Sequence, residues 1–94
     1  MIEIIKYTSE MCMPCKRQAE IIDGIRDAFP EITFTTADRD QNPDLAEMFG
    51  TNVPQLIYKV DGKIIQSKIG LQTSSEIISM IKKIRNNNVN RTTS

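Results

Sequence analysis

The chain opens with a nearly continuous apolar run and then changes to a helical pattern. Residues 2–7 carry three isoleucines and a tyrosine, which is typical of a strand buried on both faces of a sheet. From Met13 to about Ala28, apolar residues recur at three- and four-residue spacing, which predicts an amphipathic helix that Pro30 ends. The apolar stripe of this helix consists of Ala19, Ile22, Ile25 and Phe29.

A second strand and a short helix follow. Residues 32–36 alternate and are rich in β-branched side chains, which indicates a strand. Because a helix separates it from the first strand, we expect the two to run parallel, joined by a right-handed crossover. Asn42 and Pro43 then form the N-cap and first residue of a short helix, and Gly50 suits the position after its end.

The second half of the chain predicts a hairpin and a final helix. Strands at 55–60 and 63–69 flank Asp61-Gly62, a strong signal for a two-residue turn. Thr73 and Glu76 have the spacing of a capping box, which begins a helix of about Ser74–Arg85. The polar stretch that follows predicts a disordered tail over residues 87–94, after a single domain spanning residues 1–86.

The predicted order is therefore β-α-β-α-β-β-α, an α/β protein with a four-stranded mixed sheet and helices on both faces. With 94 residues the chain has room for one core. Twelve basic and twelve acidic residues balance, which argues against nucleic acid or an anionic membrane as the main partner. The chain begins with strand-like sequence and shows no signal-peptide pattern, so we expect a cytoplasmic location.

Candidate chemistry lies at the junction between the first strand and first helix, where Cys12 and Cys15, the only cysteines, stand three residues apart. A helix N-terminus favours a thiolate at the first position, and the second thiol lies within closing distance. With two cysteines and no histidine, a closed zinc site within one chain is excluded. The alternatives are a structural disulfide, which gains little from so small a loop, or half of an intermolecular metal site.

The residues around the cysteines each have two interpretations. Lys6 either extends to water from the strand end or lies near the cysteines and lowers a thiol pKa. Lys16 and Arg17 either add positive potential beside the thiols or are ordinary solvated charges. Met11 and Met13 form either a soft apolar rim for varied partners or simple loop packing.

Several motifs together resemble the thioredoxin/glutaredoxin superfamily, in family order from residue 2 to about 85. The matching segments are Cys12-Met13-Pro14-Cys15, Asp40-Gln41-Asn42-Pro43 followed by Gly50, Val53-Pro54-Gln55-Leu56, Asp61-Gly62-Lys63 and Ile69-Gly70. The resemblance implies the thioredoxin-like fold and a thiol–disulfide oxidoreductase that needs no cofactor besides a redox-active Cys12–Cys15 disulfide. It implies that Cys12 is the nucleophile and Cys15 the resolving thiol.

The resemblance also implies a substrate groove and partners. The groove would comprise a cis-proline at the start of a strand, facing Cys12, a glycine that borders it, and the residues around the cysteines. These residues are Met11, Met13, Pro14, Val53, Pro54 and Gly70. The partners would be disulfide-containing proteins such as ribonucleotide reductase, with thioredoxin reductase or glutathione as electron donor. The protein would act as a monomer.

Departures from the family pattern narrow the class. The strand and helix that precede this unit in a full thioredoxin are missing, and Met11 stands where thioredoxins usually carry tryptophan. Lys6 replaces a buried carboxylate, and Met13-Pro14 lacks the tyrosine usual in glutaredoxins. The chain looks most like the small thioredoxins of phages, bacteria and archaea, and a phage protein would act in the host cytoplasm. Alternatives are a glutathione-dependent glutaredoxin-type reductase and a non-catalytic partner-binding module.

Overall fold

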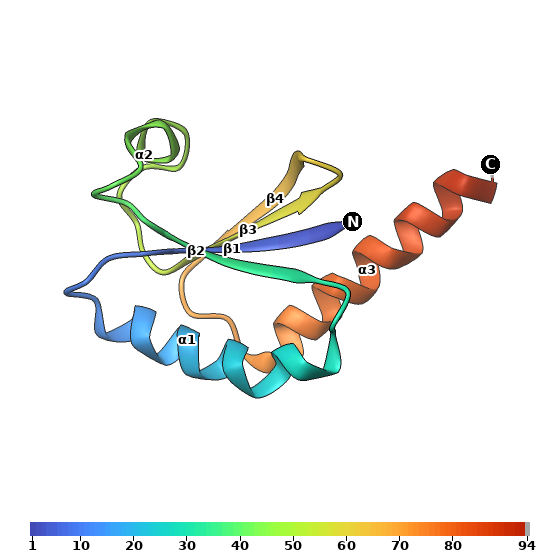
Figure 1. Ribbon diagram of the computed structural model, residues 1–94, viewed down its shortest axis with the longest axis horizontal. Coiled ribbons are helices and arrows are strands. Elements are labelled where there is room, and N and C mark those ends of the chain that lie inside the picture. Colours follow the sequence, from blue (N-terminus) through green and yellow to red (C-terminus); the bar gives the residue numbers. More distant parts are fainter. Residues whose placement is uncertain (94) are drawn as a thin grey trace.

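The computed structural model describes residues 1–93, with the side chains of residues 1–86, and has two helical layers around one sheet (Figure 1). Its strands are β1 (Ile2–Thr8), β2 (Thr33–Asp38), β3 (Gln55–Val60) and β4 (Lys63–Ile69). Its α-helices are α1 (Met13–Ile25), α2 (Pro43–Phe49) and α3 (Ser74–Thr93), and a 3₁₀ turn, η1 (Arg26–Ala28), extends α1.

The sheet has the order β2-β1-β3-β4. β1 runs parallel to β2 and antiparallel to β3, and β3 and β4 form the hairpin. Figure 1 shows α1 and α3 on one face of the sheet and α2 on the other. The predicted four-stranded mixed sheet with helices on both faces is therefore confirmed.

The core consists of two clusters, one on each face of the sheet. Ile4 packs with Leu56 and Ile77 in the larger cluster, on the face that α1 and α3 cover. Its neighbour Ile5 packs with Ile57 and residues of α2 in the smaller cluster. Successive side chains of a strand point to opposite faces, so the unbroken apolar run of β1 fills both clusters.

The helix α1 buries its predicted stripe and, on the same face, one polar residue. Ile22 is buried and Ala19 and Ile25 are partly buried, as the periodicity indicates, but Gln18 is also buried, with no exposed surface. A buried amide is costly unless it is hydrogen-bonded. Gln18 meets this requirement through the backbone of Gln72, a contact between segments far apart in the sequence.

The helix α3 begins as predicted but ends later. Glu76 N–H donates to Thr73 Oγ1 (3.2 Å) and Thr73 N–H donates to Glu76 Oε1 (3.1 Å), so the capping box is formed. The helix continues to Thr93, past the predicted end near Arg85, because no proline or glycine follows to stop it. The sequence predicts a disordered tail over residues 87–94, whereas the backbone of residues 87–93 is helical. The side chains of residues 87–93 and the whole of Ser94 lie outside the described residues. Within the described residues, no helix combines the length and apolar character that crossing a bilayer requires.

Replacing Thr73 by alanine removes the side-chain half of the capping box. We expect the free energy of unfolding to fall by about 1 kcal/mol, because the Glu76 N–H at the start of α3 loses its partner. Urea unfolding of the wild type and of T73A measures this loss. The matched control is Ser79→Ala, an exposed change further along α3, and an equal loss in both variants would contradict the assignment.

Tyr58 makes stability sensitive to alkaline pH. It is 1 % exposed, and burial, with a smaller contribution from Glu76, raises the pKa of its hydroxyl to about 12. The unfolded tyrosine ionises near pH 10 while the folded one stays neutral. The contribution of Tyr58 to the free energy of unfolding is therefore fully present below pH 10. It is lost as the pH rises toward 12, by about 2 to 3 kcal/mol. Urea titrations from pH 9 to 12 should show a shallower loss in Tyr58→Phe, and parallel curves would rule the effect out.

Candidate active site

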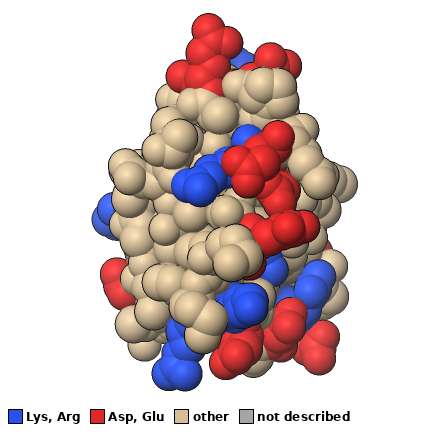
Figure 2. All heavy atoms as spheres, turned by 90° about the vertical axis from the view of Figure 1, so that its left-hand side faces the viewer, with Lys and Arg blue, Asp and Glu red and all other residues tan. Residues whose placement is uncertain are grey.

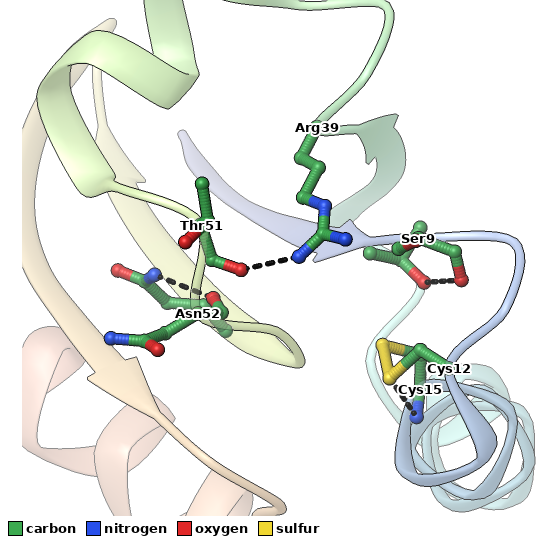
Figure 3. Close-up of a disulfide and its surroundings, with 8 residues drawn as sticks. Ser9, Cys12, Cys15, Arg39, Thr51 and Asn52 are labelled. Atoms are coloured by element: carbon green, nitrogen blue, oxygen red, sulfur yellow. Dashed lines mark hydrogen bonds between the residues drawn. A yellow bond between two sulfur atoms is a disulfide. The ribbon is translucent and has the colours of Figure 1, made fainter.

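The two cysteines form a disulfide at the turn that joins β1 to α1 (Figure 3). Their Cα atoms are 5.2 Å apart, and Cys12 is the N-cap residue of α1. The Cys15 N–H donates to Cys12 Sγ at 3.1 Å. Cys12 is partly exposed, whereas Cys15 is 2 % exposed. One sulfur is therefore open to a partner, and the other lies protected beneath it.

The local field favours a negative charge on Cys12 when the disulfide is reduced. The unpaired N–H groups at the start of a helix carry a partial positive charge, and the first turn of α1 contains no acidic residue. The N–H of Cys15 already points at Cys12 Sγ. Lys16 and Arg17 lie exposed on the same turn, where solvent weakens their effect.

The loop before β3 and the end of β4 form the other side of the site. The Val53–Pro54 peptide bond is cis, the form that the family resemblance implies. Pro54 is buried and Val53 is partly buried. Gly70 N–H donates to the Pro54 oxygen at 2.8 Å. Gly70 has φ +96°, a conformation that a side chain would strain, so glycine is needed here. The structure thus brings together the predicted groove residues Pro54 and Gly70.

Three side chains hold the loop 49–52 through its carbonyl oxygens, and sequence reasoning did not identify them as parts of the site. The donors come from β1, from the connection between β2 and α2, and from β3. The distances are 2.8 Å from the Tyr7 hydroxyl to Gly50 O, 2.6 Å from Arg39 Nη1 to Thr51 O, and 3.3 and 3.2 Å from Gln55 Nε2 to Phe49 O and Asn52 O. Each carbonyl of the loop therefore has a side-chain donor.

Figure 3 shows how this loop faces the disulfide: Thr51 and Asn52 lie across from Cys12, and the Arg39 guanidinium points toward the Thr51 oxygen. Burial raises the pKa of the Tyr7 hydroxyl, while Arg39 acts in the opposite direction. Tyr7 therefore stays a neutral donor at ordinary pH. A tyrosine near the end of an isoleucine-rich strand was the sequence signal for this role.

Exposed apolar side chains surround the disulfide turn and the end of β4. Met11 is 95 % exposed and Met13 is 72 % exposed, and both flank Cys12 in the sequence. Ile69 and Leu71, on either side of Gly70, are 61 % and 44 % exposed. The end of the molecule that carries the β1–α1 turn presents an uncharged area, with acidic and basic groups above and below it (Figure 2). The methionines are thus open to solvent rather than packed in a loop.

Lys6 lies away from the first turn of α1. It lines a small hollow with Ile22 and Asp23 of the second half of that helix and with Arg26 of η1. Because side chains alternate along β1, Lys6 shares the face of Ile4, not that of Tyr7. A role for Lys6 in lowering a thiol pKa stays a prediction, and no described contact of Lys6 supports it.

Comparison with known proteins gives the family. The thioredoxin family model matches residues 2–83. A thioredoxin of Chlamydia muridarum is 30 % identical over 81 residues, which is 85 % of this chain and 79 % of the relative. The oxidised mitochondrial thioredoxin 3 of Saccharomyces cerevisiae superposes with a TM-score of 0.77 at 28 % identity, covering 87 % of this chain and 77 % of that one. Fasciola hepatica thioredoxin, at 23 % identity and TM-score 0.77, shares the fold over 87 % of this chain and 79 % of its own.

Two conclusions follow. The fold and the paired cysteines make this protein a thiol–disulfide oxidoreductase. The match over residues 2–83, together with the identity to the chlamydial protein, is specific enough to add that the chain belongs to the thioredoxin family. The comparisons do not favour the glutaredoxin alternative.

In the reduced protein, we expect Cys12 to react with iodoacetamide roughly ten times faster than Cys15, because it is more exposed and lies at a helix N-terminus. The single variants Cys12→Ser and Cys15→Ser leave one thiol each, so mass spectrometry gives the two rates separately. The pH dependence of the Cys12 rate should give a pKa below that of a free thiol. Faster alkylation of Cys15 would reverse the assignment of the two sulfurs.

Proposed function

We propose that the chain reduces disulfide bonds of other proteins, with Cys12 as nucleophile and Cys15 as resolving thiol. The thiolate of Cys12 attacks one sulfur of the substrate disulfide, and the other substrate sulfur leaves as a thiolate that takes up a proton. Cys15, having lost its proton, then attacks Cys12 Sγ and releases the first substrate sulfur. Two electrons pass to the substrate, and the Cys12–Cys15 disulfide forms.

The observation that carries this proposal is the unequal burial of two bonded sulfurs. Cys12 is open to a bulky protein disulfide, and Cys15, at 2 % exposure, is reached only from Cys12. This arrangement favours attack by Cys12 first and resolution by Cys15 second. The dithiol itself holds both electrons, so the exchange needs no prosthetic group.

The substrate segment would lie in extended form between the disulfide turn and the cis-proline loop. Val53, before Pro54, offers its backbone groups on one side, and Gly70 leaves room beside them because nothing lies within 4 Å of its Cβ position. On the other side, Met11, Met13 and Pro14 are exposed next to Cys12. Methionine adapts to differently shaped apolar partners, which fits a reductase with several substrates.

The electron donor would be a thioredoxin reductase, since the family comparisons point to thioredoxins rather than glutaredoxins. Ribonucleotide reductase is a candidate among the disulfide-containing targets. The protein would act as a monomer in a reducing compartment, the cytoplasm, where a regenerated dithiol persists.

A reductant test separates the candidate donors. The oxidised protein is mixed either with NADPH and thioredoxin reductase or with glutathione and glutathione reductase, and its thiols are trapped by alkylation and counted by mass. We expect fast reduction in the first mixture, and onward reduction of insulin disulfides. Cys12→Ser should abolish insulin reduction, whereas Cys15→Ser should accumulate a mixed disulfide with the substrate.

Other outcomes assign other functions. Reduction by glutathione alone would support the glutaredoxin-type reaction instead. A Cys12→Ser, Cys15→Ser double variant that keeps full biological function would identify a partner-binding module and overturn the redox proposal. Ser79→Ala, an exposed change on α3, serves as the control for handling and folding.

A further inference from the structure

We propose that Gln18 is a positioning residue for this reaction. Its side chain fixes the segment between β4 and α3, and through that segment Pro54, relative to the helix that carries Cys15. The proposal rests on the proposed function, because it assigns a residue to the same substrate groove. Among the described residues, the hydrogen bonds of Gln18 go to Gln72 and not to either sulfur, so its effect is on geometry rather than on the chemical step.

The first observation is a two-bond pairing between an amide and one backbone residue. Gln18 Nε2 donates to Gln72 O at 3.1 Å, and Gln72 N–H donates to Gln18 Oε1 at 2.7 Å. The two residues are 54 positions apart, and Gln18 has no exposed surface. A neutral amide carries both a donor and an acceptor, so it satisfies both backbone groups of Gln72 at once.

The second observation is that the pairing continues to the cis-proline loop. Gln72 Nε2 donates to Gly70 O at 3.1 Å, and Gly70 N–H donates to Pro54 O at 2.8 Å. An unbroken series of hydrogen bonds therefore joins Gln18 to Pro54. Since Gln18 follows Cys15 by one helical turn on α1, this series connects the two sides of the groove.

The segment between β4 and α3 depends on these hydrogen bonds. Residues 70–73 lie between β4 and α3, where neither the sheet ladder nor the helix supplies partners for the backbone of Gln72. A buried polar network whose groups are all satisfied specifies one arrangement, and unpaired buried groups are costly. An apolar residue at position 18 would leave the Gln72 N–H and oxygen without their partners. The segment that carries Gly70 would then shift or loosen against Pro54.

The effect of replacing Gln18 on the reaction should depend on the size of the substrate. A protein disulfide spans from Cys12 to the backbone at Val53 and Pro54, so its fit depends on the distance between the two sides. A small aromatic disulfide reaches Cys12 without this contact. Loosening the segment beside Pro54 weakens contacts that hold only the larger substrate, and a loss of such binding raises KM with little change in kcat. We therefore expect loss toward protein substrates and little change toward the small disulfide.

The first test compares steady-state kinetics of the wild type and Gln18→Met, which keeps the side-chain length without a strong donor or acceptor. We expect KM for insulin to rise about tenfold, the equivalent of a lost buried hydrogen bond, with kcat nearly unchanged. Reduction of a small aromatic disulfide should stay at the wild-type rate. The matched control is Gln66→Met, since Gln66 is exposed on β4 and its amide reaches only the neighbouring Ser67 oxygen.

The second test uses Gln18→Glu and keeps the proposal testable if Gln18→Met does not fold. A protonated carboxyl has one donor and one acceptor and can replace the amide, whereas an ionised carboxylate cannot donate to the Gln72 oxygen. Burial raises the pKa of such a carboxyl. The ratio of the KM of Gln18→Glu to the wild-type KM should therefore be near one at about pH 5.5 and rise several-fold by pH 8. Division by the wild-type value at each pH removes the titration of Cys12.

The outcomes separate the two proposals. An unchanged KM for insulin in folded Gln18→Met, or equal losses toward insulin and the small disulfide, overturns the positioning role. A KM ratio for Gln18→Glu that is raised equally at pH 5.5 and pH 8 also overturns it, because the protonated carboxyl can replace the amide. A lower thermal midpoint with wild-type kinetics would make Gln18 a structural residue only. If the wild type itself fails to reduce insulin, it is the proposed function that fails, and the Gln18 variants are not needed to show it.

Discussion

The burial of β1 on both faces at the centre of the sheet is the constraint on which the rest of the structure depends. Ile4 and Ile5 point into different clusters, so β1 needs helices above and below it. Because β1 is antiparallel to β3, with Tyr7 opposite Gln55, the end of β1 meets the start of β3. The disulfide turn follows one of these strand ends and the cis-proline loop precedes the other. The sheet register therefore brings the disulfide turn and the cis-proline loop to the same end of the sheet.

Hydrogen bonds from side chains to backbone groups then fix the loops that the sheet leaves without partners. Tyr7, Arg39 and Gln55 hold the carbonyls of residues 49–52, and Gln18 holds the backbone of Gln72. These donors lie on β1, β3, α1 and the connection between β2 and α2. Elements that the core packs rigidly thus determine the shape of the segments facing Cys12. Exposed methionines provide the adaptable part of the surface.

The difference in exposure between the two cysteines has a simple physical origin. A strand that runs directly into a helix places Cys12 at the N-cap, where backbone N–H groups favour a thiolate. The spacing of three residues turns Cys15 inward by most of a helical turn, toward the buried side of α1. Solvent exposure and the electrostatic field of the helix therefore differ between Cys12 and Cys15, although both belong to one short motif.

The sequence by itself determined the elements and the chemistry, because both depend on neighbours along the chain. The hydrophobic period and the turn residues were sufficient to predict β3, β4 and the hairpin between them. The pair Thr73 and Glu76 was sufficient to predict the start of α3. The spacing of Cys12 and Cys15 identified the dithiol. Only the tertiary structure decided that Lys6 lies beside the second half of α1, and that the polar Gln18, on the helical face of Ile22 and Ile25, is buried and paired with the backbone of Gln72. These features depend on side-chain partners distant in sequence, and no local pattern specifies such partners before the strands are in register.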